Sequence, residues 1–330
     1  MKAEAVDFLR GLNSIQGMRL FSHLDADGIC SLAILTSFLR KRGLISTGLP
    51  PDFFLTDVPP SRIDTAPVMV FTDMSSDTIL EYLNRDTLVI DHHIFAKRPA
   101  CAFYNPRETD PTAYIPASYL VYEVTSEIEN MEDLKWVAAV GVLGDKGEEN
   151  SEICRKFVGQ FSNVGELNRV AEYICSVNLV EGNTGNAKML EALVMAKSAQ
   201  EIIDNPYFRY CYNDVQNEIA AAGKKVESEG IFRFVDVNSR YNVKSIIAAQ
   251  LLDKEPGIVV VAYSNSDEFS KMSLRTNTDV NLGEIARKAA NAVGGTGGGH
   301  EKAAGAKIPK DKFGYFKEEL MLAAEKFGAK

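Results

Sequence analysis

The sequence lacks an apolar run long enough to cross a bilayer, and it has no cysteine pair at metal-binding spacing. One of its longest apolar stretches, WVAAVGVLG at 136–144, falls far short of the roughly 20 residues that a membrane helix needs. The N-terminal MKAEAVDFLR carries acidic residues where a signal peptide needs an apolar core. The five cysteines are odd in number, scattered and never in CxxC spacing, which is typical of reduced, mostly buried thiols. We therefore expect a cytoplasmic protein without a membrane partner.

A strongly basic surface is also missing, because the net charge is −9 over 330 residues. This charge argues against a protein that clamps long duplexes. Residues 1–206 hold 18 Lys and Arg against 29 Asp and Glu, whereas residues 207–330 hold 18 against 16. An acidic half suits divalent cations, although two solvated surfaces that simply differ in charge would give the same counts.

The length predicts two domains of α/β type. Strand-like runs at 18–22, 68–72 and 87–90 alternate with turns and helical stretches, which predicts a mostly parallel sheet with helices on both faces. Further strand-like runs beyond residue 230 and a helical stretch at 281–293 predict a smaller mixed-sheet α/β domain. We expect a catalytic domain over 1–182, a linker helix over 183–206 and a substrate-binding domain over 207–330.

Three of the four histidines stand beside carboxylates, at places where apolar strands are expected to end. Ligands collect beyond the carboxyl ends of parallel strands, so these side chains should converge. The candidates come from SHLDADG (22–28), FTDMSS (71–76), VIDHH (89–93) and GVLGDKG (141–147), and they are His23, Asp25, Asp27, Asp73, Asp91, His92, His93 and Asp145.

Carboxylates and imidazoles without a thiolate favour Mn²⁺ or Mg²⁺ over zinc. One ion cannot use so many ligands, whereas two ions sharing a carboxylate can, and such pairs hydrolyse phosphoesters. Taken singly, Asp25 or Asp27 could be a helix cap and Asp73 a turn residue. Their common position at strand ends favours the metal site.

A second candidate site is GGTGGGHEKAAG at 294–305, whose glycine run GGTGGG at 294–299 we expect to form a loop. Its consecutive glycines, Gly297, Gly298 and Gly299, free backbone N–H groups to approach a phosphate, and His300 follows them. Arg275, at the end of an alternating strand, could clamp a phosphate or be an ordinary surface arginine. The sequence has no GxxxxGK[ST] phosphate-binding loop.

These motifs in this order resemble the DHH phosphoesterase superfamily, named for the triplet Asp91-His92-His93, and GGGHEKAAG resembles the signature of its companion domain. The resemblance implies two Mn²⁺ ions, replaceable by Mg²⁺ or Co²⁺, and an active site in the cleft between the domains. It assigns His23 and Asp25 to one ion, Asp27, His92 and Asp145 to the other, and Asp73 to both. Asp91 would orient an imidazole, while His93, Arg275 and His300 would face the substrate phosphate.

The compact two-domain form is most similar to archaeal RecJ-like exonucleases. This resemblance implies a hydrolase that releases nucleoside monophosphates from single-stranded DNA or RNA in DNA replication or repair, with GINS as a partner, and we favour 3′→5′ polarity. One alternative is an oligoribonuclease or 3′,5′-bisphosphonucleotide phosphatase. A non-catalytic replication-fork scaffold is the alternative from another class. The oligomeric state is open.

Overall fold

The computed structural model describes residues 2–14, 17–46, 48–50, 52–56, 68–80, 83, 86–222 and 225–326. Its contacts divide the chain into two compact units, Met1–Tyr212 and Asn213–Lys330. Both units are α/β, the first with a parallel sheet and the second with a mixed sheet, so the predicted two-domain fold class is confirmed.

Unit 1 contains a five-stranded parallel sheet in the order β2-β1-β3-β4-β5. The strands are β1 (Met18–Ser22), β2 (Phe53–Leu55), β3 (Val68–Thr72), β4 (Thr87–Ile90) and β5 (Ala102–Tyr104). The helices of unit 1 are α1 (Lys2–Gly11), α2 (Ala26–Lys41), α3 (Ala117–Ser126), α4 (Lys135–Gly144), α5 (Gly147–Asn150), α6 (Glu152–Val158), α7 (Val164–Met195) and α8 (Ala199–Asp204).

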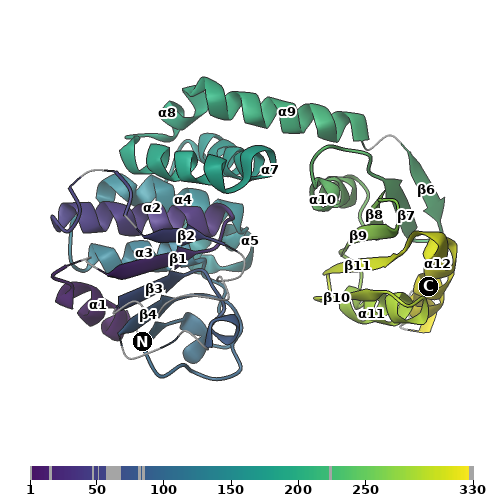
Figure 1. The fold of residues 1–330 in the computed structure, drawn as a ribbon, viewed down its shortest axis with the longest axis horizontal. Coiled ribbons are helices and arrows are strands. Elements are labelled where there is room, and N and C mark those ends of the chain that lie inside the picture. The colour runs from purple at the N-terminus through teal and green to yellow at the C-terminus, as the bar shows by residue number, and fades with distance from the viewer. Residues whose placement is uncertain are drawn as a thin grey trace. The chain divides into compact units, whose positions relative to one another are not determined.

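The alternation of side chains along the strands builds two separate cores in unit 1. Leu20, Val70 and Leu88 face the helical layer, where every residue of α2 from Ala26 to Leu39 is buried among α3, α4 and α7. Figure 1 shows this layer stacked on one side of the sheet. On the other face, the ring of Phe21 stacks between those of Phe54 and Phe71, with centroids 4.9 and 4.7 Å away.

The helical segment that follows the first sheet is broken at three places: at Gly182, at 196–198 and at Asn205. The long helix α7 has a non-helical backbone at Gly182, with φ of 57° and ψ of −141°. Residues 183–206 then form the second part of α7, α8 and the first residue of α9 (Pro206–Ala222). The chain passes from unit 1 to unit 2 within α9.

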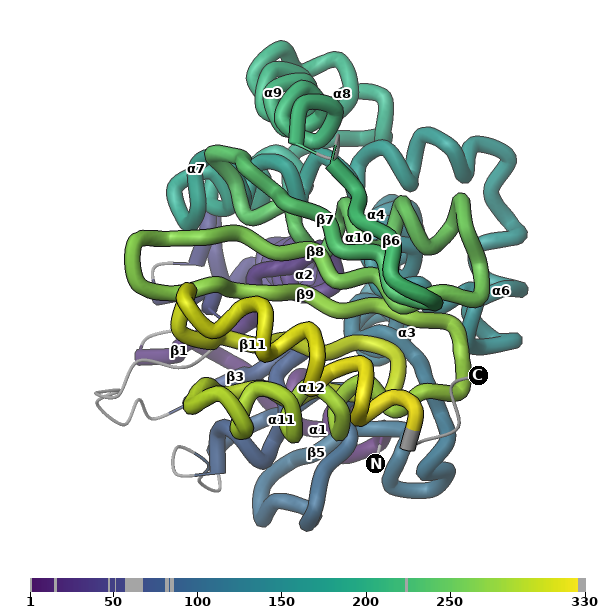
Figure 2. The backbone as a smooth tube through the Cα atoms, turned by 90° about the vertical axis from the view of Figure 1, so that its right-hand side faces the viewer, coloured from purple at the N-terminus to yellow at the C-terminus, as the bar shows by residue number. Residues whose placement is uncertain are grey.

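Unit 2 contains a six-stranded mixed sheet in the order β10-β11-β9-β8-β7-β6, in which only β7 and β8 pair in parallel. Helices α11 and α12 lie side by side against it (Figure 2). The strands are β6 (Val226–Glu229), β7 (Phe232–Asp236), β8 (Val259–Asn265), β9 (Phe269–Thr276), β10 (Thr296–Gly299) and β11 (Ala303–Pro309). The helices are α10 (Lys244–Lys254), α11 (Leu282–Ala292) and α12 (Phe313–Lys326).

The structure corrects two expectations about local structure. The apolar run before Asp145 is the helix α4 and not a strand, because a short, fully buried apolar run suits either element. The end of the glycine run is the edge strand β10 and not a loop, since Thr296–Gly299 pairs with β11. Gly298 and Gly299 have φ of 153° and 144°, which only glycine adopts without strain.

Gly283 allows the turn after β10 to lie against the start of α11. Its N–H donates to the carbonyl oxygen of His300 at 3.0 Å, and a Cβ at this position would lie 2.2 Å from the carbonyl oxygen of Gly299. Gly314 provides a contrast, because a Cβ there meets nothing within 4 Å.

We predict that Gly283→Ala lowers the free energy of unfolding of unit 2 by about 1–3 kcal/mol, because the new methyl group must displace backbone. The control Gly314→Ala in α12 should be neutral or stabilising by up to about 1 kcal/mol, since alanine favours helix. Differential scanning calorimetry measures both effects. An unchanged transition in Gly283→Ala would contradict this packing.

Candidate metal centre

Adjacent strands of the unit 1 sheet end beside one another and bring most of the candidate residues together. His23 follows β1, Asp73 follows β3, and the segment Asp91–His93 follows β4. These three strands are neighbours and run in parallel, so their carboxyl ends lie at one edge of the sheet. The sequence placed these residues at strand ends, and the structure agrees.

Asp25 and Asp27 belong to the start of α2, and each also stabilises a helix end. Asp25 is the N-cap, and its Oδ1 accepts a hydrogen bond from the backbone N–H of Gly28 at 3.0 Å. Asp27 is buried and accepts from Ala117 N at 2.6 Å and Ser118 N at 2.9 Å, at the start of α3. A role in stabilising a helix end and a role as metal ligand are therefore compatible for Asp25 and Asp27.

Asp73 lies between the two histidines at the centre of the cluster. Its Oδ1 is 3.3 Å from His92 Nε2, and its Oδ2 is 3.7 Å from His23 Nδ1. Asp73 has a left-handed backbone with φ of 56°, which costs about 1–3 kcal/mol in a residue other than glycine. Among the described residues, no hydrogen-bond partner reaches its buried Oδ2. A buried, unpaired carboxylate oxygen in a strained residue fits a metal ligand.

Asp145 reaches the cluster from the end of α4. Its Oδ2 accepts from the Tyr114 hydroxyl at 2.7 Å and lies 3.5 Å from His92 Nε2. The Tyr114 ring also stands edge-on to the His92 ring, with centroids 5.3 Å apart. The sequence analysis missed Tyr114, because nothing in the loop before α3 marks it.

Asp91 and His93 form a pair beside these residues. His93 Nδ1 lies 2.7 Å from Oδ1 of the buried Asp91, and the His93 backbone N–H donates to Asp91 Oδ2 at 3.2 Å. Asn105 donates to the carbonyl oxygen of His93 at 2.9 Å, and Arg107 donates to that of His92 at 2.8 Å. Both follow β5, so their position after a strand is a signal that the sequence analysis overlooked.

The described residues offer three sets of ligand atoms, and the atoms of each set lie within 4.8 Å of one another. The sets are His23, Asp25 and Asp73; Asp27, His92 and Asp145; and Asp73, His92 and His93. All donors are carboxylate oxygens or imidazole nitrogens, which suit Mn²⁺ and Mg²⁺. This part of the chain can therefore hold metal ions.

The electrostatics of the cluster favour a cation. Burial, followed by the charge of Asp145, raises the pKa of Asp27 to about 7. Burial, followed by the charge of Asp25, raises the pKa of Asp145 to about 6, and burial with the charge of Asp27 raises the pKa of Asp73 well above its usual range. Carboxylates that resist ionisation together are relieved by a positive ion.

The pKa values of His92, His93 and Asp25 are shifted in the directions that favour neutral His92, protonated His93 and ionised Asp25. Burial, followed by the nearby His93, lowers the pKa of His92 to about 4, which keeps this imidazole neutral as a metal ligand must be. Burial acts to lower the pKa of His93, but the hydrogen bond and charge of Asp91, together with the charge of Asp145, outweigh it and raise the pKa. Burial acts to raise the pKa of Asp25, but the hydrogen bond and charge of His23, with the hydrogen bond from Gly28, outweigh it and lower the pKa to about 2.

The other predicted site residues lie in unit 2. Arg275 in β9 is half-buried; its Nη2 donates to the Ser245 hydroxyl at 2.6 Å, and burial lowers its pKa. It pairs across the sheet with Ala303, whose carbonyl oxygen accepts from the exposed His300 N–H at 2.7 Å. The three glycines lie in β10, His300 lies in the turn between β10 and β11, and Arg275 lies in β9 on the other side of β11.

The fold and the cluster define a two-domain α/β protein with a carboxylate and imidazole site at the strand ends of its first domain. Two family models match it: the DHH family, N-terminal domain, over residues 18–143, and the DHHA1 domain over residues 229–326. The chain belongs to the DHH phosphoesterase superfamily and is a hydrolase of phosphoester bonds, as its motifs predicted.

Known proteins share this architecture at low sequence identity. The uncharacterized protein MJ0831 of Methanocaldococcus jannaschii is 22% identical over 91% of each chain. The crystal structure of exonuclease RecJ bound to manganese matches with a TM-score of 0.74 at 18% identity, over 99% of this chain and 95% of that one. The pGpG-specific phosphodiesterase PggH of Vibrio cholerae matches with a TM-score of 0.59 at 17% identity, over 94% and 100%.

No helix of the described segments combines the length and the apolar character that a membrane-spanning helix needs.

We predict that the metal-free protein loses stability as the pH rises from 6.5 to 8. Asp27 and Asp145 have raised pKa values, so their contribution is present at low pH and is lost as the pH passes about 6 to 7. His92 acts in the opposite sense: its unfolded-state pKa of 6.5 lies at the lower limit of this interval, so it restores about 0.4 kcal/mol between pH 6.5 and 8. The expected net loss is roughly 0.5 kcal/mol.

Thermal denaturation in the presence of a chelator measures this loss, and saturation with Mn²⁺ is the control that should abolish it. A metal-free melting temperature that stays level or rises over this interval would show that the carboxylates are not held together as described.

Proposed function

We propose that the protein is a Mn²⁺-dependent exonuclease that removes nucleoside monophosphates from single-stranded DNA or RNA. The observation that carries the proposal is the position of Asp73 between two ligand sets. The first set is His23 and Asp25, and the second is Asp27, His92 and Asp145. The fold shared with the manganese-bound exonuclease RecJ supports it.

The two ligand sets would each hold one divalent cation, with Asp73 common to both. Cations held there would supply Lewis acidity at the phosphoryl group and a lowered pKa for the attacking water. The Tyr114 hydroxyl fixes the orientation of the Asp145 carboxylate. Arg107 donates a hydrogen bond to the backbone carbonyl oxygen of His92 and so holds the backbone of this histidine in place.

His93 would contact the phosphate of the substrate. Its ring is oriented by Asp91, and the raised pKa favours the imidazolium form, which donates a proton to a hydrogen bond and offsets negative charge on the phosphate oxygens. Arg275 and His300 would bind the phosphate from unit 2, with the backbone N–H groups of Gly297–Gly299 beside them. The resemblance to the DHH superfamily implies this arrangement, with the active site in the cleft between the domains.

The substrate length separates this proposal from its main alternative, an oligoribonuclease or 3′,5′-bisphosphonucleotide phosphatase. That alternative has its own support, because the Vibrio cholerae enzyme with this fold is specific for the dinucleotide pGpG. The non-catalytic scaffold is less well supported, since a scaffold has no need to keep a full ligand set. Pairing with GINS, a role in replication or repair, and the 3′→5′ polarity stay predictions.

We predict progressive product ladders on strands of about 20 to 30 nucleotides with Mn²⁺, and release of the 3′ label before the 5′ label. Asp73→Asn should reduce hydrolysis more than about 100-fold, because losing even a ligand's partner costs up to that much. Asparagine tolerates the left-handed backbone of this position, so the fold should persist. The exposed residue Asp77, four positions away, provides the matched control Asp77→Asn.

Turnover confined to the shortest oligomers would favour the alternative. Full activity in Asp73→Asn would overturn the shared metal ligand, and no turnover of any strand with metal bound would revive the scaffold.

We also predict that Arg275→Ala raises KM about tenfold or more and lowers kcat less, because a charge-assisted hydrogen bond to a substrate phosphate is lost. The half-buried guanidinium hydrogen-bonds Ser245, so the melting temperature of the variant should be measured beside its kinetics. A decrease in kcat alone would place Arg275 in the transition state instead.

A further inference from the structure

One face of the unit 2 sheet is only partly covered. Along β9 the buried residues Met272 and Leu274 face the core formed with α11 and α12. The alternate residues therefore face the opposite side, where Arg275 hydrogen-bonds Ser245 in α10. On this side β9 presents Phe269, Lys271, Ser273 and Arg275.

The neighbouring strand β11 extends this face with small residues and another lysine. Lys307 pairs with Lys271, Gly305 with Ser273, and Ala303 with Arg275. Directly opposite residues of antiparallel strands share a face, so the lysine pair and Arg275 lie on the same side of the sheet. They are separated by four residues along β9, or about 13 Å at about 3.3 Å per residue.

A cavity of about 380 Å³ adjoins the Lys271 end of this face. Lys244, Ser264, Phe269 and Lys271 are among the residues that line it, and Lys244 Nζ lies 3.0 Å from the Ser264 hydroxyl. The ammonium group of Lys307 stands over the Phe269 ring, 4.1 Å from its centroid. The cavity thus combines cations with an aromatic ring.

The charges of these lysines are not neutralised within the described segments. Lys244, Lys271 and Lys307 form no ion pair with a carboxylate there, whereas Arg240 at the rim is held by Asp214 and Glu218. Burial, followed by the charge of Lys271, lowers the pKa of Lys244. Uncompensated cations gathered on a polar surface attract an anionic ligand.

We propose that this surface, the basic track formed by Lys244, Phe269, Lys271, Arg275 and Lys307, binds the sugar-phosphate backbone of single-stranded nucleic acid. Phosphates would contact the three lysines, and a base would stack on the exposed part of Phe269. The small residues between Arg275 and the lysine pair leave room for a strand to lie against the sheet. The track rests on the proposed function and deepens it, because it would give the enzyme a preference for strands longer than a dinucleotide.

The test compares the binding of a 20-nucleotide single strand at several salt concentrations in the Asp73→Asn background, which prevents cleavage. Each phosphate contact on a single strand contributes about 0.7 to the slope of log K against log salt, so Lys271→Gln/Lys307→Gln should lower the slope by about 1.4. At about 0.1 M salt, the double variant should bind roughly 25-fold more weakly. Lys271→Arg/Lys307→Arg should keep the slope.

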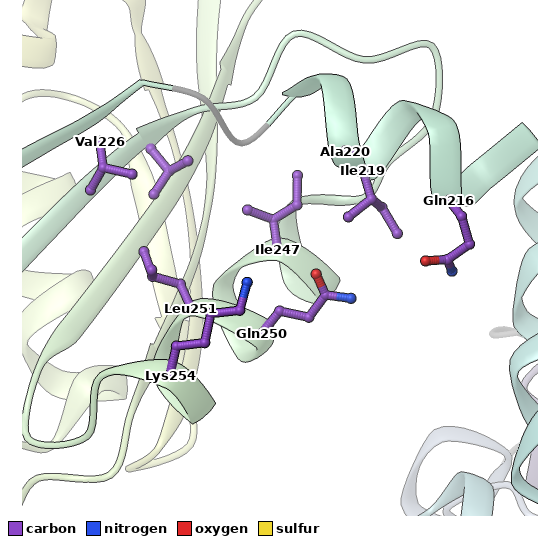
Figure 3. Close-up of a pocket in the computed structure, with 9 residues that line it drawn as sticks. Gln216, Ile219, Ala220, Val226, Ile247, Gln250, Leu251 and Lys254 are labelled. Carbon is purple, nitrogen blue, oxygen red and sulfur yellow. The ribbon is translucent and has the colours of Figure 1, made fainter. Parts of the chain in front are cut away.

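Lys254→Gln is the matched control. Lys254 is an exposed lysine at the other end of α10, about 15 Å from Lys244, beside a separate cavity lined largely by aliphatic side chains such as Ile219, Ile247 and Leu251 (Figure 3). It should bind the strand with the slope of the parent protein. In the active protein, the double variant should also lower the ratio of kcat/KM on the 20-mer to kcat/KM on a dinucleotide.

An unchanged slope and affinity in the folded double variant would overturn the track, even if the enzyme hydrolyses long strands. A lower slope in a protein that hydrolyses no strand would keep the track and reject the exonuclease. A decrease of the slope by about 0.7 in Lys254→Gln, half that of the double variant, would show that only the overall charge of unit 2 matters.

Discussion

Unit 1 buries several carboxylates at the edge of its sheet, and the repulsion among their charges is the constraint that the rest of the structure must satisfy. Asp27 and Asp73 are almost inaccessible to water; the charge of Asp27 raises the pKa of Asp73, and the charges of Asp145 and Asp25 raise the pKa of Asp27. A fold that places such groups together loses stability unless something positive joins them. The parallel sheet makes the arrangement possible because neighbouring strands all deliver their next residues to one edge. In the proposed metal centre, metal binding and the stability of unit 1 would therefore be two aspects of the same interaction.

Much of this arrangement could be predicted from the sequence, because it follows from strand ends. The strands before His23, Asp73 and Asp91 are short, apolar and followed at once by polar residues. The sequence therefore predicts both that these runs are strands and that their polar ends meet at one edge of a parallel sheet. Asp145 was harder to place. Its preceding run, 136–144, is buried from Trp136 to Leu143 and has no periodicity to separate helix from strand. The residue joins the cluster in spite of this, from a helix end.

Contacts that come from loops could not be predicted. Tyr114 lies in an irregular segment, and its hydrogen bond to Asp145 depends on how that segment folds over the sheet edge. The glycine run raised a different difficulty, since glycines permit a loop and a strand equally. Pairing with β11 decides for the strand, and that pairing is a tertiary contact. The basic track was also invisible, because register alone places Lys271 beside Lys307.

The two hydrogen bonds that Asp27 accepts from the start of α3 connect the cluster to the packing of a distant segment. Asp27 can keep its carboxylate in place only while the backbone of Ala117 and Ser118 is held against it, and α3 is held by its own apolar contacts with α2 and α4. With a cation held at Asp27 as proposed, its affinity would include part of the cohesion of the helical layer. Residues inside that layer, such as Leu120 and Val124, would then be determinants of metal affinity although neither carries a ligand atom.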